Sequence, residues 1–214
     1  MKKIFLIAAL IYFSAIIAQT EKGTFVISGK SGLGFNSTTV KYNYEGQTTN
    51  GPKTSSFTIS PSVGYFIIDN LELGLELDYS NKKTKSHFDK YYDDYSVMYD
   101  AKEIQNIFSI MPNVTYFFSK TKVRPYLNTG IGFANFKLES TSVSSTSDGS
   151  AYYYEKNSGN GLTWNAGGGL AYFITKSFSF DLGIDYTKFT YKKDGVKTKS
   201  GVLGANIGIS LFIK

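Results

Sequence analysis

Apolar residues alternate with polar or small residues in eight separate stretches of this chain. In the clearest stretch, residues 71–80, every odd position is leucine or tyrosine and every even position is Glu, Gly, Asp or Ser. The other stretches cover residues 24–35, 56–65, 104–116, 124–133, 162–172, 178–186 and 203–213. A period of two places one face of a β-strand against an apolar medium. The pattern therefore predicts an all-β protein of eight strands.

Composition removes several classes of site. The chain has 214 residues, which suits one domain, and 42% of them are hydrophobic, which excludes a disordered tail. It has no cysteine and one histidine, His87, so disulfides, thiolate metal sites and sites with two histidines are excluded. We therefore predict no metal and no cofactor. Of 23 basic residues only Arg124 is an arginine, so the lysine excess indicates solvated surface or attraction to anionic lipid headgroups rather than nucleic acid.

The first residues have the features of a secretory signal peptide. Lys2 and Lys3 precede an apolar run, residues 4–18, that only Ser14 interrupts. A membrane-spanning helix needs about 20 apolar residues, so this run is short for one. We predict a signal peptide over residues 1–18 and a mature domain over residues 19–214. An uncleaved anchor helix is the alternative.

The connections between the eight stretches alternate in length. Those near residues 67–70, 119–122 and 174–177 are tight turns, whereas the others are long and polar and cover residues 37–54, 81–102, 139–160 and 189–200. Short turns on one side and long loops on the other are typical of an outer-membrane barrel with periplasmic termini. We predict an eight-stranded antiparallel transmembrane up-and-down β-barrel. A soluble sandwich is the alternative, because one face could also pack on a core.

Aromatic residues near both ends of the apolar face favour the membrane barrel. Two such rings match the interfacial girdles of membrane barrels, and closing the sheet removes its edges. The predicted girdle residues are Phe25, Phe35, Phe57, Tyr65, Tyr79, Tyr116, Phe133, Trp164, Tyr172, Phe178 and Tyr186.

The opposite face is rich in glycine and carries charge. Eight strands enclose a space that side chains just fill, which argues against a wide pore. The predicted inward charges are Lys30, Glu72, Glu76, Asp78, Arg124, Asp181 and Asp185. Because burying an unpaired carboxylate is costly, we expect a network of ion pairs and hydrogen bonds that closes the barrel. A gated cation path is the alternative.

A local motif suggests a family. Residues 64–75 read GYFIIDNLELGL, which resembles the strand–turn–strand hairpin of small OmpA/OmpX-like outer-membrane β-barrels, and residues 171–183 are a weaker echo of it. This resemblance covers the mature chain and implies the outer membrane of a Gram-negative bacterium, with the long loops extracellular. In the last strand Asn206, Gly208, Leu211 and Ile213 resemble the signal read by the barrel-assembly machinery, although the chain ends on lysine where many members end on an aromatic residue.

Two of the long connections are candidates for binding a partner. Tyr91, Tyr92, Asp93, Asp94 and Tyr95 combine tyrosine with acids, as recognition surfaces do. The alternative is a polar hairpin that extends two strands above the membrane. The acids lack EF-hand spacing, so no metal site is predicted. Residues 139–160 are rich in serine and tyrosine and predict a mobile surface loop.

The sequence carries little evidence for catalysis. A lipid A deacylase would need Ser, His and an acid, and His87 is the only possible base, with Ser86, Ser96 and Asp89 near it in a loop. We therefore predict a non-enzymatic barrel with a structural or interaction role, whose loops contact lipopolysaccharide, surfaces or a partner membrane protein. A lipid A-modifying enzyme or a narrow ion channel is the alternative.

Overall fold

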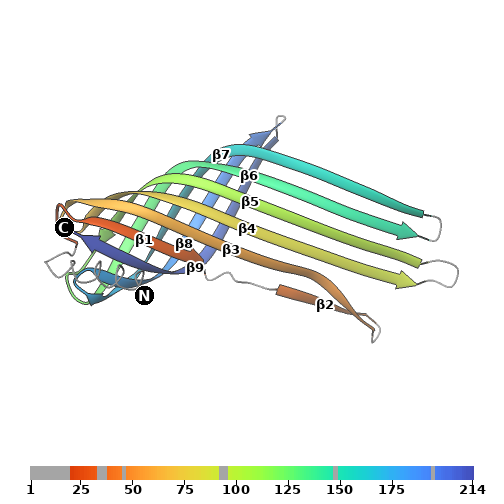
Figure 1. The fold of residues 1–214 in the computed structure, drawn as a ribbon, viewed down its shortest axis with the longest axis horizontal. Coiled ribbons are helices and arrows are strands. Elements are labelled where there is room, and N and C mark those ends of the chain that lie inside the picture. The colour runs from red at the N-terminus through yellow and green to blue at the C-terminus, as the bar shows by residue number, and fades with distance from the viewer. Residues whose placement is uncertain (1–19, 33–37, 45–46, 92–95, 147–148, 194–195) are drawn as a thin grey trace, which may run out of the picture.

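The computed structural model describes residues 20–32, 38–44, 47–91, 96–146, 149–193 and 196–214. Most of these residues lie in β-strands (Figure 1), and no helix among them is long and apolar enough to cross a bilayer. The strands are β1 (Phe25–Gly32), β2 (Thr38–Tyr44), β3 (Gln47–Ile68), β4 (Leu71–Tyr91), β5 (Ser96–Phe117), β6 (Val123–Thr146), β7 (Gly149–Thr175), β8 (Phe178–Lys193) and β9 (Val196–Ile213).

Eight of these strands form a closed antiparallel ring. Each strand from β3 to β9 pairs with the next, and β1 closes the ring by pairing with both β9 and β3. At the closure Phe25 lies opposite Ile213 on one side and Tyr65 on the other. The predicted eight-stranded up-and-down barrel is confirmed.

The apolar residues of each alternating stretch face outward and their neighbours face inward, as predicted, because successive side chains of a strand lie on opposite faces. Each strand of the ring exposes apolar side chains on its outer face. One example from each strand is Ile27, Val63, Leu73, Ile110, Ile131, Leu170, Leu182 and Ile209. Their neighbours in sequence point into the barrel, and many are buried.

The turns at one end of the barrel are short, as expected. β3 and β4 are joined by two residues, and Asn70 adopts a positive φ of 67°, which asparagine tolerates. Residues 118–122 join β5 to β6, and residues 176–177 join β7 to β8. The described part of the chain begins and ends at this same end (Figure 1). There Lys214 forms an ion pair with Glu21.

At the other end the strands continue far beyond the length that a bilayer requires. β7 has 27 residues and β6 has 24, whereas a membrane crossing takes about 10. The expectation of a mobile loop over residues 139–160 is wrong, because residues 139–146 pair one for one with residues 149–156. Residues 81–91 and 96–102 likewise pair as strands, as the hairpin alternative predicted.

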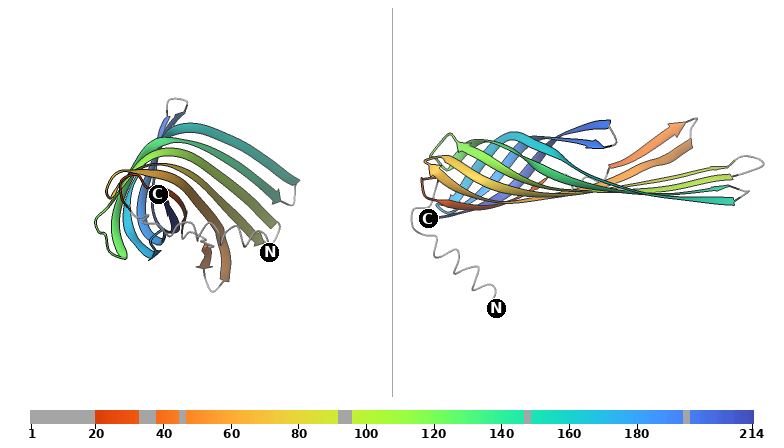
Figure 2. Two further views of the ribbon diagram at one scale, coloured as in Figure 1. Left: turned by 60° about the vertical axis from the view of Figure 1, so that its left-hand side comes forward. Right: turned by 90° about the horizontal axis from the view of Figure 1, so that it is seen from above.

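The extended parts of β4, β5, β6 and β7 form one four-stranded sheet, here called the ribbon, that projects from the barrel (Figures 1 and 2). β2 was not predicted. It pairs only with residues 47–54 of β3, outside the ring, where the sequence indicated a loop.

Candidate functional site: the filled barrel interior

An aromatic plug fills the interior at the end with the short turns. It consists of the buried residues Val26, Phe66, Phe117, Tyr126, Ala171, Phe173 and Phe212. The centroid of the Phe66 ring lies 5.9 Å from that of Phe117 and 6.2 Å from that of Phe212, and Phe173 lies 4.9 Å from Phe212. These spacings are typical of packed aromatic side chains.

Sequence reasoning missed this plug because it assigned mainly polar and small residues to the inside. A signal was present in the doubled aromatics Tyr65-Phe66, Tyr116-Phe117 and Tyr172-Phe173. In each pair the first ring is exposed on the outer face and the second is buried inside the barrel. A doubled aromatic at a strand end therefore marks both a girdle position and a plug position.

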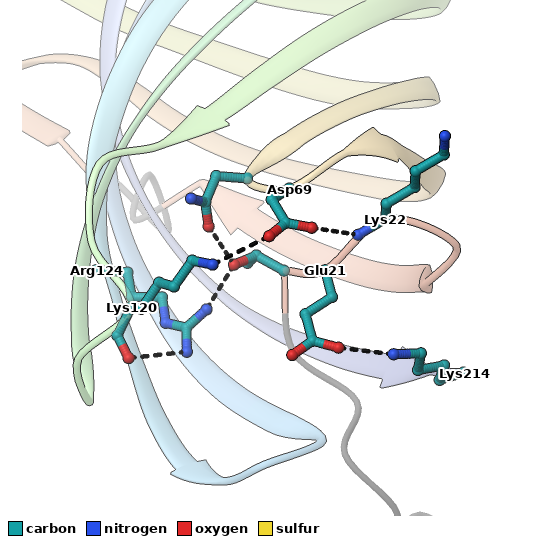
Figure 3. Close-up of polar contacts among 8 residues, drawn as sticks. Glu21, Lys22, Asp69, Lys120, Arg124 and Lys214 are labelled. Carbon is teal, nitrogen blue, oxygen red and sulfur yellow. Dashed lines mark hydrogen bonds and ion pairs between the residues drawn. The ribbon is translucent and has the colours of Figure 1, made fainter.

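Below the plug, at the end of the barrel with the short turns, Arg124 binds Thr20, the first described residue. Arg124 is 1% exposed, and its guanidinium carbon lies 4.2 Å from the centroid of the Phe173 ring. Nη1 donates to the Thr20 hydroxyl at 2.6 Å, and that hydroxyl donates to Asn70 Oδ1 at 2.6 Å (Figure 3). Nε also donates to the carbonyl of Thr121 at 3.0 Å. The prediction that Arg124 belongs to the central charged network is wrong, because its position at the start of β6 places it at the barrel mouth.

Two ion pairs strengthen the same region. The Asp69 carboxylate accepts hydrogen bonds from the Lys22 amide and from Lys120 Nζ, both at 3.0 Å, and these bonds hold the pKa of Asp69 below its usual value. Lys214 Nζ lies 2.6 Å from Glu21 Oε2. We call the eight residues of Figure 3 the latch: Thr20, Glu21, Lys22, Asp69, Asn70, Lys120, Arg124 and Lys214.

Above the plug lies a charged layer with five carboxyl groups and one lysine. Glu72, Glu76 and Asp181 are buried, and Lys30 Nζ lies 3.9 Å from Glu76 Oε2. Asp78 and Asp185 point to the same interior. The structure thus brings together six of the seven predicted inward charges, and the seventh is Arg124.

Amide and hydroxyl donors contact four of these five carboxylates. Asn165 donates to Glu76 Oε1 at 3.2 Å, and Ser109 donates to Asp78 at 2.8 Å. Asp185 accepts one hydrogen bond from Asn128 at 3.1 Å and another from Asn206. Asp181 accepts hydrogen bonds from Ser179 and Ser210. Such bonds offset part of the cost of burying a carboxylate.

Glycines on the inner face make room for this layer. Gly64 lies opposite Gly74, and a Cβ atom at Gly64 would collide with the Glu72 carboxyl group. A Cβ atom at Gly167 would collide in the same way with Asp185. Of the two motif glycines, Gly64 therefore provides space for Glu72, and Gly74 provides space mainly for the Asn113 side chain.

A cavity of about 30 Å³ lies between the plug and the charged layer, next to Lys30, Glu72 and Asp181. It is lined by Asn113 and Tyr126, and the Asn113 Oδ1 atom and the Tyr126 hydroxyl are buried without a hydrogen-bond partner among the described residues. This volume holds about two water molecules, which would satisfy both groups.

A second apolar cluster lies above the charged layer. Ala134, Phe136 and Phe189 are buried, and Ile107, Leu138 and Tyr191 pack against them. The centroid of the Phe136 ring lies 4.4 Å from that of Tyr191. A Cβ atom at Gly159 would lie 2.7 Å from the Phe136 ring, so this glycine is needed for the close approach.

The predicted girdle residues lie on the outer face of the ring wherever they are described. Eight are exposed: Phe25, Tyr65, Tyr79, Tyr116, Phe133, Trp164, Tyr172 and Tyr186. Phe57 and Phe178 are half-buried, and Phe35 lies outside the described residues. In the predicted assembly signal, Asn206 is buried inside the barrel and Gly208 points inward, whereas Leu211 and Ile213 face outward.

The predicted partner loop is only partly described. Tyr91 ends β4, and Tyr92, Asp93, Asp94 and Tyr95 lie outside the described residues. Below this tip the His87 Nδ1 atom lies 2.7 Å from Asp100 Oδ1, and both side chains are more than half exposed. Within the described ranges no group of three or more metal-ligating side chains occurs.

Together these features define a class of protein. A closed ring of antiparallel strands with an apolar outer face and a buried charged layer in its interior is a transmembrane β-barrel, because closure satisfies the backbone hydrogen bonds in lipid. The family model described as "Outer membrane protein beta-barrel domain" matches residues 5–208. The chain belongs to this family and resides in the outer membrane, which confirms the resemblance noted in the sequence. The latch is periplasmic and the ribbon is extracellular.

Solved structures of similar fold cover almost the whole chain at low sequence identity. The N-terminal barrel domain of Pseudomonas aeruginosa OprF is 16% identical, with a TM-score of 0.46, and the match covers 90% of this chain and 98% of that one. Neisserial surface protein A is 15% identical, with a TM-score of 0.42 and coverage of 89% and 97%. OprG of P. aeruginosa is also 15% identical, with a TM-score of 0.44 and coverage of 90% and 97%. No curated protein sequence gives a significant match.

Proposed function

We propose that this protein is a non-enzymatic structural and interaction component of the outer membrane. In this proposal the barrel is a stable membrane body without a wide pore, and the ribbon contacts lipopolysaccharide, surfaces or a partner membrane protein. The observation that carries the proposal is the filled interior. An aromatic plug, a charged layer and a second apolar cluster follow one another along the barrel, and the described cavity there is about 30 Å³.

The ribbon supports the interaction role. It holds four strands well beyond the lipid-facing band and exposes large side chains, including Tyr152, Tyr153 and Tyr154. Tyrosine is enriched at protein interfaces because it combines a large contact area with a polar tip. A paired ribbon also presents these side chains at less entropic cost than a flexible loop, because its backbone is already ordered.

The geometry around His87 gives little support to an enzyme. His87 and Asp100 lie opposite each other on β4 and β5, at an exposed position of the ribbon. Ser86 adjoins His87 in the strand, so its side chain lies on the opposite face. A Ser–His pair needs hydrogen-bond contact, which this arrangement opposes. The described interior cavity, of about 30 Å³, is also too small for an acyl chain.

Export and assembly complete the proposal. Residues 1–18 act as the signal peptide, and the barrel-assembly machinery reads Asn206, Gly208, Leu211 and Ile213 during insertion. The pattern of the last strand supports this role, with its polar residue and glycine facing inward and its apolar residues facing lipid.

Three measurements on the native protein test this function. A pull-down from outer membranes in mild detergent, analysed by mass spectrometry, should recover a partner through the ribbon. Planar bilayers should show no conductance, and the lipid A mass spectrum should not change on expression. Conductance that is lost in Glu76→Ala would establish a channel instead. A lipid A change that is lost in His87→Ala would establish an enzyme.

A further inference from the structure

Three lysines lie side by side on the outer face of β3, β4 and β5. Lys53 is directly opposite Lys85, and Lys85 is directly opposite Lys102. Directly paired residues of neighbouring strands point to the same face of a sheet. Lys85 lies six positions from the lipid-facing Tyr79, so this face is the outer one. All three lysine side chains are exposed.

The row lies a short distance above the lipid-facing band. The band ends at Tyr79, where the Tyr79 hydroxyl and the Asn81 amide both donate to Asn106 Oδ1, at 3.0 and 2.7 Å. Lys85 is four residues beyond Asn81, which is about 13 Å along the strand and about 10 Å along the membrane normal at a usual barrel tilt. A lysine side chain can reach back several ångströms toward the membrane. The ammonium groups therefore lie near the headgroups of the outer leaflet.

The positive charge of these three lysines is not neutralised by the described residues. Like charges directly opposite each other in a sheet are destabilising. Among the described residues no carboxylate forms an ion pair with any of the three lysines. Two acids with described side chains on the same face have other partners, since Glu139 lies 3.2 Å from Lys156 and Asp100 lies 2.7 Å from His87. An external anion with several charges would relieve the repulsion.

We propose that Lys53, Lys85 and Lys102 form a binding site for the phosphate groups of lipid A in the outer leaflet. This inference rests on the proposed function and specifies the ligand on one face of the protein. A membrane lipid fits better than a soluble anion, because the site lies on the outer face directly above the girdle. There, acyl chains packed against the lipid-facing band would bring their own headgroup phosphates to the lysines.

The test measures lipid A binding to the full-length protein in detergent by native mass spectrometry. Each lysine near an anionic surface contributes about 1 kcal/mol, which is roughly a fivefold change in affinity. K85Q/K102Q should therefore bind bisphosphorylated lipid A about 30-fold more weakly than the wild type. Dephosphorylated lipid A should bind the wild type and this variant equally weakly.

The matched control is K122Q/K176Q, which removes the same charge from two exposed periplasmic positions. It should bind bisphosphorylated lipid A like the wild type, and heat-modifiable migration on gels should show that both variants fold. Wild-type affinity in K85Q/K102Q, an equal loss in the control, or equal binding of dephosphorylated lipid A by the wild type would each overturn the site. Displacement of lipid A by millimolar inorganic phosphate would also overturn it in favour of a soluble anion. These outcomes are independent of conductance and lipid A chemistry, which test the proposed function.

Discussion

Replacing Phe66 by alanine should lower the free energy of unfolding by about 4 kcal/mol, because a buried Phe→Ala change typically costs about 3–5 kcal/mol. Phe66 is fully buried at the centre of the plug, with two aromatic neighbours about 6 Å away. The surrounding strands are held by the hydrogen bonds of the closed ring, so they cannot collapse into the space. The cost should therefore fall in the upper part of that range.

The neighbouring residue provides the control. Tyr65 faces outward, is 38% exposed and packs its ring 4.8 Å from that of Phe25. In Tyr65→Ala lipid can fill the space, so the loss should be limited to the aromatic contact, about 1 kcal/mol. Urea unfolding of the inserted protein in lipid vesicles measures both variants. Fluorescence of the single tryptophan, Trp164, which faces outward, reports the transition.

The difference between the two variants is the decisive quantity. If Tyr65→Ala destabilised the barrel as much as Phe66→Ala did, the assignment of one ring to lipid and the next to the interior would be refuted. If Phe66→Ala cost less than about 1 kcal/mol, the plug would not be packed as described, because that loss is below the usual range for a buried ring.

Three further changes test the charged layer and the latch. Gly64→Val should destabilise the barrel by about 1–3 kcal/mol, because its Cβ atom collides with Glu72. At Gly29 a Cβ atom would meet no atom within 4 Å, so Gly29→Val should cost less than about 1 kcal/mol in the same denaturation assay. Thr20→Val should cost about 1–3 kcal/mol and lower the unfolding midpoint, since it removes the hydroxyl that accepts a hydrogen bond from the buried Arg124 guanidinium. An unchanged midpoint would contradict the latch. Folding lowers the pKa of Asp69, so its carboxylate stabilises the folded protein fully above the ordinary pKa of 3.8. This stabilisation is lost as the pH falls through the lower pKa of the folded state. Asp69→Asn should therefore weaken the decline in stability between pH 5 and pH 2, roughly the range for a paired carboxylate.

The ring could be predicted from sequence because lipid imposes a simple rule on every strand. An outward residue must be apolar wherever the strand crosses the hydrocarbon, so Leu71, Leu73, Leu75 and Leu77 determine the phase of β4 without knowledge of any other strand. The same reasoning placed Lys30 and Glu76 inside the barrel. It also predicted which connections are tight, since those turns are too short to contain anything else.

The interior was harder to predict, because its contents depend on partners from distant strands. Phe66 and Phe212 are 146 positions apart in sequence, and their rings meet only after the barrel closes. Arg124 points into the barrel like the residues of the charged layer. Its position along the barrel axis, however, places it in the latch beside Thr20. Alternation with a period of two predicts which face of the strand a side chain occupies, but not which side chain it contacts.

Taken alone, the sequence determined the strand number, the lipid-facing surface and the tight turns, because each depends on local alternation and on the fixed properties of a bilayer. Tertiary structure decided the plug, the donors to each buried carboxylate, the ordered ribbon and the lysine row. All of these depend on register, which sets the residue that lies opposite another across neighbouring strands. Lys53, Lys85 and Lys102 are separated by 32 and 17 positions in the chain, and pairing of β3, β4 and β5 brings them together. A change of two residues in either register would preserve every apolar face but would place a residue other than lysine opposite Lys85, which is why only the folded barrel reveals the row.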